Sequence, residues 1–583
     1  MSRDKKIAPW VIGGLGVLFI FLVGLIALLP TLINLGPIRE KILADISQTV
    51  GGQVACERFE LSFLPRPHVT IYQARLSIPG KVSGNLASVT MHPRIPSILM
   101  GKVCLASVKV AAPDLTVAVQ GKGPDKIKEK SKPFSVVAIQ ERVAPLFAVL
   151  ASQAPSLRVQ VENAKLRVSE DKQPVFECQD IRAFMELPAN QVKVDVTGFA
   201  FRTDGLRDLR ASLASSPPSV TGGRLEEPRV IKGKDLRVTS HINRDKTVMS
   251  LVDLNLNEPQ VNITGELLLK QTSPQVSLEL EGREIGVDST RDAALALAGD
   301  IAATRRIFEI VKGGKAPLIH LRTHGNSWHD LGKGENILIK GSMLDGKIFV
   351  PGVHLDLEDV KGDVIISKGI LEGNNLEARM GSIGGREGTL KLGLRGKNAP
   401  FHLDMLIQAD LAQLHPVLKR LAANQSFGHE MDLIDNLQGY GTGRLVLGES
   451  TTSIKTRLDL SEFNLSGYYK RIPYPLEISG QDFSYNERTV HARQLSGKLG
   501  KSSFAGVSLG LDWEKRPHLE LKSPRFEMFL GEVYSWLASL DRSKVYLRDF
   551  KRVDGVVSLS ELRLEGPLFQ PEDWHWNTRG EIR

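Results

Sequence analysis

Three histidines and an aspartate gather in the segment HLRTHGNSWHDLG, which holds the strongest candidates for chemistry in this sequence. His320, His324 and His329 are spaced four and five residues apart, and Asp330 follows them. Imidazole and carboxylate groups at such spacings can meet around a metal ion. However, the segment continues the strand-like PLIHL and contains a glycine turn, so no helix aligns the histidines on one face. We therefore interpret them as surface or turn residues and expect no metal, cofactor or catalytic residue.

The other motifs that would indicate catalysis are incomplete or missing. GKSS at 500–503 resembles the end of a phosphate-binding loop, but Leu495 stands where such a loop requires glycine. Neither G-x-S-x-G nor H-E-x-x-H occurs. The paired carboxylates Glu358 and Asp359 lie in an alternating segment that predicts a solvated strand. The sequence therefore favours a protein that is not an enzyme, and an enzyme using the three histidines is the last of three hypotheses.

The elements that carry these residues are strands, and the first of them lie in residues 59–78, FELSFLPRPHVTIYQARLSI. Apolar and polar residues alternate on both sides of LPRP, as in strands with one dry face. Pro65 and Pro67 lack the N–H that a sheet ladder needs, so they predict a turn. The segment therefore predicts a β-hairpin. Its apolar positions are Phe59, Leu61 and Phe63, then Val69 and Ile71, then Ala74, Leu76 and Ile78 on the opposite parity.

A long apolar segment precedes these strands. Residues 10–29 are uncharged and long enough to cross the hydrocarbon core of a bilayer as a helix. No convincing cleavage signal follows, which favours an uncleaved anchor over a signal peptide. Arg3, Lys5 and Lys6 precede the span, so we expect a cytoplasmic N-terminus and a single pass, with the bulk of the chain across the membrane. The expected anchor residues are Trp10, Leu15, Leu18, Phe19, Phe21, Leu22, Leu25, Leu28 and Leu29.

Composition excludes several classes of protein. The chain has 583 residues and a formal net charge of +9 without a dense basic run, so we expect no nucleic-acid partner. Its 53 glycines and few aromatic residues favour turns and strands over long helices. Only Cys56, Cys104 and Cys178 are present, too few for a disulfide scaffold and at spacings that match no zinc or redox motif. Buried, unreactive cysteines are the better interpretation, although one bridged pair is an alternative.

Four regions follow from these patterns. Residues 1–36 are the cytoplasmic tip and anchor, and residues 37–120 are a region of strands that opens with an amphipathic helix over 37–50. Residues 121–136 are a charged, apolar-poor linker, and residues 137–583 are repetitive strands with short helices. The short helices are predicted at 304–311, 409–423 and 530–540, with one interrupted helix after the linker.

A repeated hairpin pattern indicates how the strands are organised. The segments 384–411 and 500–526 share a glycine turn, an alternating strand, a turn with proline and a second alternating strand, and 263–282 is a looser third copy. Repeated hairpins with little helix predict a mainly β fold, an elongated antiparallel sheet in which each strand rests on its neighbours. Several separate β-sandwich domains are the alternative.

These residues resemble the AsmA-type family of bacterial envelope proteins. The resemblance covers the helix at 37–50, the turn GGQV at 51–54, the strand LSFLPRPHVTI and the run LASVTMHPRIPSILMGKVCLASVKVAAPDLTVAV at 86–119. Residues 341–396 also resemble the middle of that family. Gln53 departs from the family, since a basic residue is expected there. These motifs specify architecture and not catalysis.

The resemblance implies a periplasmic protein anchored in the inner membrane and related to bridge-like lipid-transfer proteins. The implied fold is a curved antiparallel sheet whose apolar concave face forms a groove for phospholipid acyl chains, with outer-membrane or envelope proteins as further partners. The alternative is a scaffold that assists assembly of outer-membrane proteins, with the apolar faces packed as a core. The strand residues that would line the groove are Val276, Leu278, Leu280, Phe401, Leu403, Met405, Ile407, Leu519 and Leu521.

Overall fold

The computed structural model describes most of the chain between residues 52 and 582. Before residue 52 it describes only Glu40, Ala44 and Ser47, all helical, which agrees with the helix predicted over 37–50. The undescribed residues within the chain are 81, 100–103, 120–153, 155, 171–172, 205–228, 244, 274, 351–353, 397, 422–425, 514–516, 540–552, 569 and 571–572. The predicted membrane anchor over 10–29 and the predicted linker over 121–136 therefore lie outside the described residues. Among the helices that the structure describes, none combines the length and the apolar character needed to cross a bilayer.

Strands account for 71% of the described residues, so the predicted mainly β class is confirmed. The chain forms two compact units, whose boundary falls within the region predicted as 137–583. The first unit comprises residues 1–305 with 318–337, and the second comprises 306–317 with 338–583. Strand β13 (Val311–Gly325) and helix α7 (Ala302–Ile310) contribute to both.

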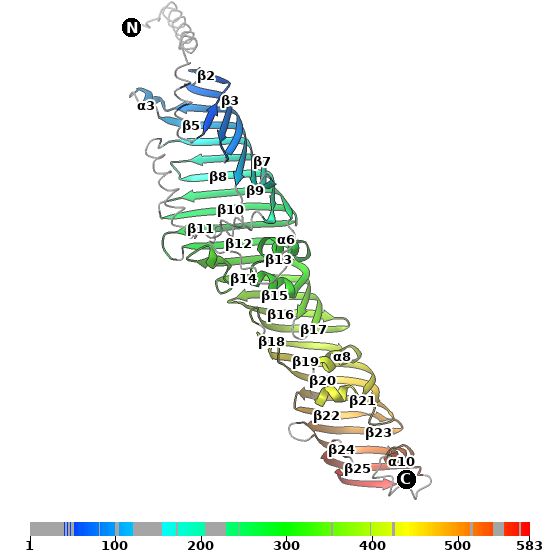
Figure 1. Ribbon diagram of the computed structural model, residues 1–583. Helices are drawn as coiled ribbons and strands as arrows, with labels where there is room; N and C mark the ends of the chain where they lie inside the picture. The colour runs from blue at the N-terminus through cyan, green and yellow to red at the C-terminus, as the bar shows by residue number, and fades with distance from the viewer. Residues whose placement is uncertain are drawn as a thin grey trace, which may run out of the picture. The chain divides into compact units, whose positions relative to one another are not determined.

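The first unit is a sheet in which strands pair with their neighbours in the sequence (Figure 1). Among the strand pairs described for this unit all are antiparallel except β5–β6, which is parallel. The short strands β1 and β2 both pair with β3, and β2–β3 is the hairpin predicted over 59–78. The strands are β1 (Gln53–Ala55), β2 (Arg58–Ser62), β3 (His68–Ile78), β4 (Val82–Pro93), β5 (Leu105–Val119), β6 (Arg158–Glu170), β7 (Gln173–Glu186), β8 (Gln191–Arg202), β9 (Val230–Ile242), β10 (Lys246–Glu258), β11 (Val261–Lys270) and β12 (Val276–Gly286).

The second unit repeats this plan with antiparallel pairs alone. In neither unit do the described strands close the sheet into a barrel or stack as two sheets. The sandwich alternative is therefore wrong for the described residues of each unit. The strands are β14 (Ile337–Val350), β15 (Leu355–Ser367), β16 (Ile370–Met380), β17 (Ile383–Gly393), β18 (Pro400–Asp410), β19 (Ile434–Ser450), β20 (Ile454–Tyr469), β21 (Pro475–Asn486), β22 (Thr489–Leu499), β23 (Ser502–Asp512), β24 (His518–Phe529), β25 (Val556–Pro567) and β26 (His575–Ile582).

The few helices lie between strands. The predicted helices at 304–311, 409–423 and 530–540 are confirmed as α7, α8 (Leu411–Leu421) and α10 (Leu530–Ser539). The three similar segments are the hairpins β11–β12, β17–β18 and β23–β24, and a helix follows each of them. The sequence analysis did not predict α3 (Ile95–Leu99), α6 (Val287–Ala298), η2 (His329–Gly332) or α9 (Ser426–Met431).

A single left-handed residue interrupts many strands near their middle. Examples are Gln73 in β3, Asn163 in β6, Asn375 in β16 and Gln494 in β22, with φ between 51° and 55°. The register shifts at or beside Asn163, Asn375 and Gln494, as at Gly373/Leu376 in β16–β17, but not at Gln73. Each β-bulge adds one residue, bends the strand and returns the following apolar residue to the same face. At Gln73 the register with β4 does not shift, and the left-handed backbone of this residue accompanies the change of parity between Ile71 and Ala74.

Substitutions at Asn375 test this conformation. Asn375→Gly should leave stability nearly unchanged or raise it, because glycine adopts φ of 52° without steric cost. Asn375→Val should lower the free energy of unfolding by about 1–2 kcal/mol, since a β-branched residue is strained there. Urea unfolding of the two variants measures the difference, and equal stabilities would contradict it.

Candidate functional site

One face of the sheet in the first unit carries unbroken rows of uncharged residues. Cross-strand pairing places one residue from each strand β2 to β12 in a single row. We call this the first row and the face that bears it the apolar face. Its members are Phe59, Ile71, Val89, Val110, Val161, Ala183, Val194, Val238, Leu251, Gly265 and Leu280.

A second row runs along the same face beyond the bulges. Ile71 and Ala74 share a cluster across the left-handed residue Gln73 of β3, and Val194 and Phe199 share one across the left-handed Gly198 of β8, so both rows lie on one face. The Phe199 ring lies over Gly233, where an added Cβ would sit 1.9 Å from Cζ. The second row is Val54, Leu76, Gly84, Leu115, Leu166, Cys178, Phe199, Gly233, Leu256 and Val261.

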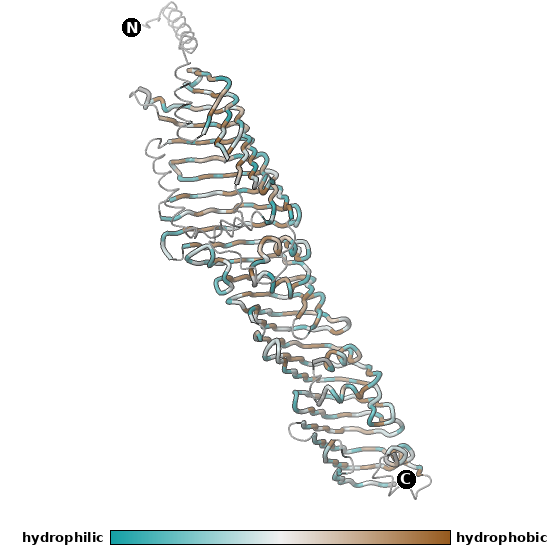
Figure 2. The backbone as a smooth tube through the Cα atoms, in the orientation of Figure 1, coloured by the Kyte–Doolittle hydropathy of each residue, from teal (hydrophilic) through white to brown (hydrophobic). Residues whose placement is uncertain are grey.

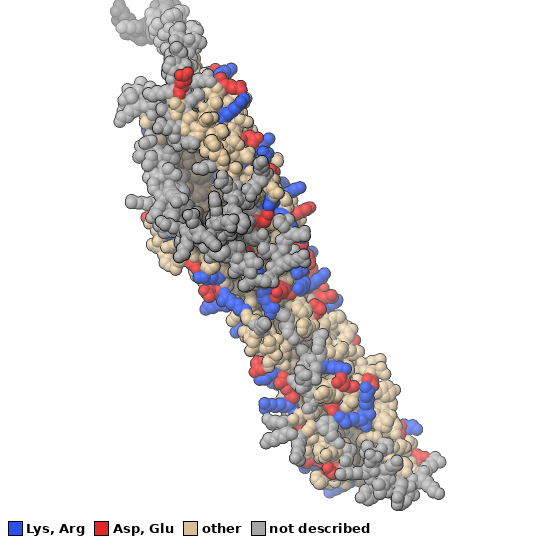
Figure 3. All heavy atoms as spheres, in the orientation of Figure 1, with Lys and Arg blue, Asp and Glu red and all other residues tan. Residues whose placement is uncertain are grey.

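The apolar face of the first unit is only partly covered. Along the first row Ile71 is buried, whereas the other members, including Val110, Val194 and Val238, are half-buried. Met249 shares this face two residues before Leu251 and is 37% exposed. The space-filling view shows a hollow over this part of the sheet, lined by residues without charge (Figure 3). A one-layer sheet thus presents apolar side chains that no second sheet covers within the described residues.

The opposite face carries charge. Ion pairs join neighbouring strands there, as in Arg158–Glu186 at 3.0 Å, Arg237–Asp195 at 3.0 Å and Lys109–Glu162 at 2.8 Å. These residues alternate with members of the rows, which gives the hydrophobic and hydrophilic alternation along each strand in Figure 2. Opposite-charge pairs across strands support the register, but exposed pairs contribute little stability each. The two faces of the sheet therefore differ in polarity: one is charged and suited to water, and the other is apolar and suited to apolar groups.

In the second unit the apolar face is packed more tightly. Phe401, Leu403, Met405 and Ile407 alternate along β18 and are 2%, 5%, 7% and 4% exposed. They belong to two clusters that extend from β14 to β23 and include residues of α7 and α8. Helix α8 adds Leu411, Leu414 and Leu418, all buried in the larger cluster. Here the chain itself covers its apolar face.

The remaining predicted groove residues lie on these same faces. Val276 is fully buried in β12, where the Trp328 ring packs on it, while Leu278 and Leu280 beside it are half-buried. Leu519 in β24 is buried and Leu521 is half-buried. Sequence reasoning missed the more open positions in the first unit, such as Val161, Val194 and Val238. Their alternation was visible, but it changes parity at each bulge.

The histidine segment has a structural explanation. His320 lies on β13 with Nδ1 3.5 Å from the carboxylate of Glu281, and His329 begins η2. Asp330 organises the loop, because its carboxylate accepts a hydrogen bond from the backbone N–H of Asn326 and pairs with Lys333 at 2.6 Å. The hydrogen bond from Lys333 holds the pKa of Asp330 below its usual value. The loop thereby places Trp328 against Val276.

The cysteines are spread through the first unit. Cys56 and Cys178 are buried, Cys104 is partly buried, and all three are free thiols. Burial raises the pKa of the Cys178 thiol to about 11, which keeps it protonated at neutral pH. The prediction of buried cysteines is confirmed for Cys56 and Cys178, and their low reactivity stays a prediction.

Sequence comparisons do not assign the chain to a family. No protein-family model matches it, and no curated protein matches it.

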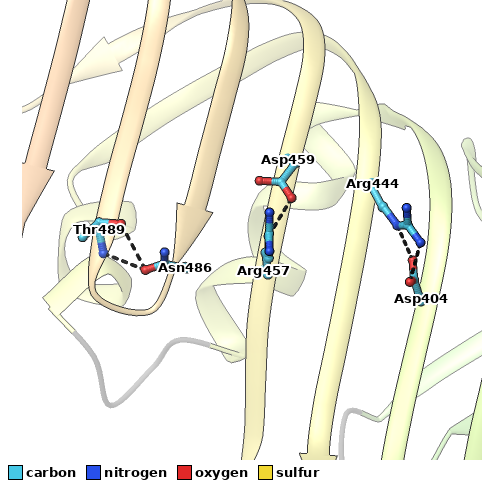
Figure 4. Close-up of polar contacts among 6 residues, drawn as sticks. All are labelled: Asp404, Arg444, Arg457, Asp459, Asn486 and Thr489. Atoms are coloured by element: carbon cyan, nitrogen blue, oxygen red, sulfur yellow. Dashed lines mark hydrogen bonds and ion pairs between the residues drawn. The ribbon is translucent and has the colours of Figure 1, made fainter.

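The ion pair Asp404–Arg444 tests the electrostatics of the charged face. Arg444 donates two hydrogen bonds of 2.7 Å to Asp404 across β18 and β19, and the side chains point toward one another (Figure 4). This hydrogen bonding holds the pKa of Asp404 below its usual value. The pair therefore stabilises the fold above about pH 4, and this contribution is lost as pH falls through the lowered pKa.

We expect Asp404→Asn to cause a small loss of stability at pH 7 and a smaller one at acidic pH. Thermal unfolding between neutral and acidic pH measures the difference. Asn486→Ala is a control without a titrating group, since Asn486 only accepts hydrogen bonds from Thr489 and Arg488 in a nearby turn (Figure 4). Parallel pH curves for wild type and Asp404→Asn would contradict the prediction.

Proposed function

We propose that this protein handles phospholipid, with acyl chains lying on the apolar face of the sheet and headgroups in water. The observation that carries the proposal is the first row of the first unit, which runs from β2 to β12 without a charged member and is half-buried at every position except Ile71. An apolar face of this extent requires an apolar cover in water. Acyl chains can provide this cover, because a long apolar chain can lie along a row of apolar residues and does not need one deep pocket.

The energetics favour such a cover. Burial of apolar surface is worth about 25 cal/mol per Å², and each buried methylene of an acyl chain about 0.8 kcal/mol. Because the row from Ile71 to Leu251 is made of aliphatic residues, a chain that slides from one of these strands to the next keeps a similar free energy. A lipid can therefore move along the row as well as bind to it.

The resemblance to the AsmA-type family supports a place in the cell envelope. On this proposal the predicted anchor over 10–29 holds the protein in the inner membrane, with the bulk of the chain in the periplasm. Phospholipid would then move toward the outer membrane, and envelope proteins would be its partners.

A scaffold for assembly of outer-membrane proteins is the second candidate. The observation that favours it is the tight packing of the second unit, where Phe401 and Leu403 lie in a core made by the chain itself. A scaffold needs closed apolar cores and binds no lipid. The apolar face of the first unit, which is more open, therefore distinguishes the scaffold function from lipid handling.

Photo-crosslinking in living cells tests the proposal. A photoreactive amino acid at Val194 or Val238 of the full chain lies on the apolar face, whereas Lys193 and Arg237 on the same strands are exposed on the charged face. With phosphate-labelled lipids, illumination should attach label to the protein at Val194 and Val238 and not at Lys193 and Arg237.

The two functions predict different results. Lipid handling predicts label at the apolar positions well above the matched positions. Label at background in all four variants, with each chain folded, would reject lipid handling and favour the scaffold.

A further inference from the structure

Two helices of the second unit, α8 and α10, accept the same kind of hydrogen bond from a turn of the sheet. The third residue of α8, Gln413, accepts a hydrogen bond of 2.9 Å from the backbone N–H of Ser382. The carboxylate of Glu532, the third residue of α10, accepts a hydrogen bond of 2.8 Å from the backbone N–H of Lys501. Both donors follow a glycine at positive φ, Gly381 and Gly500, in the turn that precedes the hairpin leading into the helix. We call this repeated contact the clasp.

Two small residues of the sheet, Gly441 and Ala409, form the surface on which α8 packs, and we call this surface the seat. Gly441 on β19 and Ala409 on β18 pair with each other beneath the helix, and both are small. A Cβ added to Gly441 would lie 3.5 Å from Cδ2 of Leu411 and 3.1 Å from Cδ1 of Leu460. Because Gly441 has ordinary backbone angles, its role is to let the helix approach closely and not to form a turn.

The polar contacts that hold α8 are weak, whereas those of α9 are stronger. Besides the clasp, α8 has the ion pair Lys419–Asp432 at 2.5 Å, with both side chains about half exposed, a hydrogen bond of 2.9 Å from the backbone N–H of Ala412 to Asp410, and one from His415 to a carbonyl. Helix α9 instead places the buried carboxylate of Glu430 against Arg471. Exposed ion pairs contribute little, so α8 is held mainly by its three buried leucines.

Resting on the proposed function, we propose that α8 is a removable cover of the lipid path. In the lipid-free chain its leucines occupy the apolar face over β18–β20, and an acyl chain takes their place when the clasp opens. The exchange replaces one apolar cover by another, so it does not leave the face exposed to water. The hydrogen bond to Gln413 adds to the hold of the leucines, so its loss should raise the population of the lifted state.

The test uses the full chain in vesicles of phosphatidylethanolamine and phosphatidylglycerol that carry a phospholipid with a photoactivatable acyl chain. Labelled peptides are mapped by mass spectrometry at 454–465, beneath α8, and at 192–201 on the first unit. Gly441→Leu fills the seat and should push the helix away, and Gln413→Ala opens the clasp. Gly448→Leu is the matched control, because it lies on the same strand and on the opposite face.

We expect Gly441→Leu and Gln413→Ala to raise labelling of 454–465 by about threefold or more, as the uncovered state gains population. Labelling should stay at the wild-type level in Gly448→Leu. The double variant Leu411→Cys with Gly441→Cys should lower it when oxidised and restore it when reduced. If Gly441→Leu does not fold, Gln413→Ala and the disulfide decide the question alone.

Hydrogen exchange at 411–421 shows whether α8 has lifted. Faster exchange there with no gain in labelling of 454–465 would overturn the removable cover. An unchanged exchange rate in Gln413→Ala would overturn the role of the clasp. Absence of label at 192–201 in the wild type would instead reject lipid handling itself, so the two failures are distinguishable.

Discussion

Leu403→Asp is expected to unfold the apolar cluster of the second unit, whereas Val194→Asp should leave the first unit folded. Leu403 is 5% exposed among Leu392 and Leu447, both fully buried, so its replacement buries a charge without a partner. The cost is on the order of 5 kcal/mol, close to the whole stability of many domains. Val194 is half-buried on the apolar face, so an aspartate there keeps contact with water. Hydrogen exchange at 401–409 and 192–201 measures each region separately.

Gln408→Asp is the control for this comparison, because it adds the same charge to β18 on the exposed face. It should have little effect on exchange anywhere. If Val194→Asp opened the first unit as completely as Leu403→Asp opens the second, the apolar face of the first unit would be a closed core. The proposed lipid path would then lose its main support.

Gly233→Val is expected to destabilise the first unit by roughly 1–3 kcal/mol, as overpacked sites do. An added Cβ would lie 1.9 Å from Cζ of Phe199, so the ring must move. In a Phe199→Leu background the same substitution should cost less, because the shorter side chain frees the space. A double-mutant cycle of urea unfolding should give a coupling energy of about 0.5–3 kcal/mol.

Gly384→Val is a matched control for the glycine substitution, since nothing lies within 4 Å of a Cβ built there. It should change stability far less than Gly233→Val. Additive effects of Gly233→Val and Phe199→Leu would show that the ring does not depend on the space above Gly233.

Much of the fold follows from alternation in the sequence. The hairpin at 59–78 and the helices α7, α8 and α10 were predictable because their apolar residues follow a period of two or a helical spacing. The change of parity at Gln73 was also visible, although its cause was not. A left-handed residue in a strand has a weak sequence signal, since Gln, Asn, Asp and Glu all occupy it here.

Helix α6 was missed because AALALA alternates as a strand does and the segment begins with valine. The state of the apolar face could not be predicted either. Leu403 and Val194 stand in equally regular alternation, but only the first is covered, because clustering with distant strands and helices decides burial. The sequence therefore predicts that the candidate site is an apolar face of strands, but it does not predict which part of that face is open.

Pairing of each strand with its neighbours in the sequence has an evolutionary consequence. Since a hairpin added or lost leaves the remaining partners in order, the number of strands in such a sheet can change by two without rerouting the chain. The three hairpins followed by helices are consistent with growth by duplication of a short gene segment. The length of the protein is thus a trait that selection can adjust in small steps, independently of the chemistry of either face.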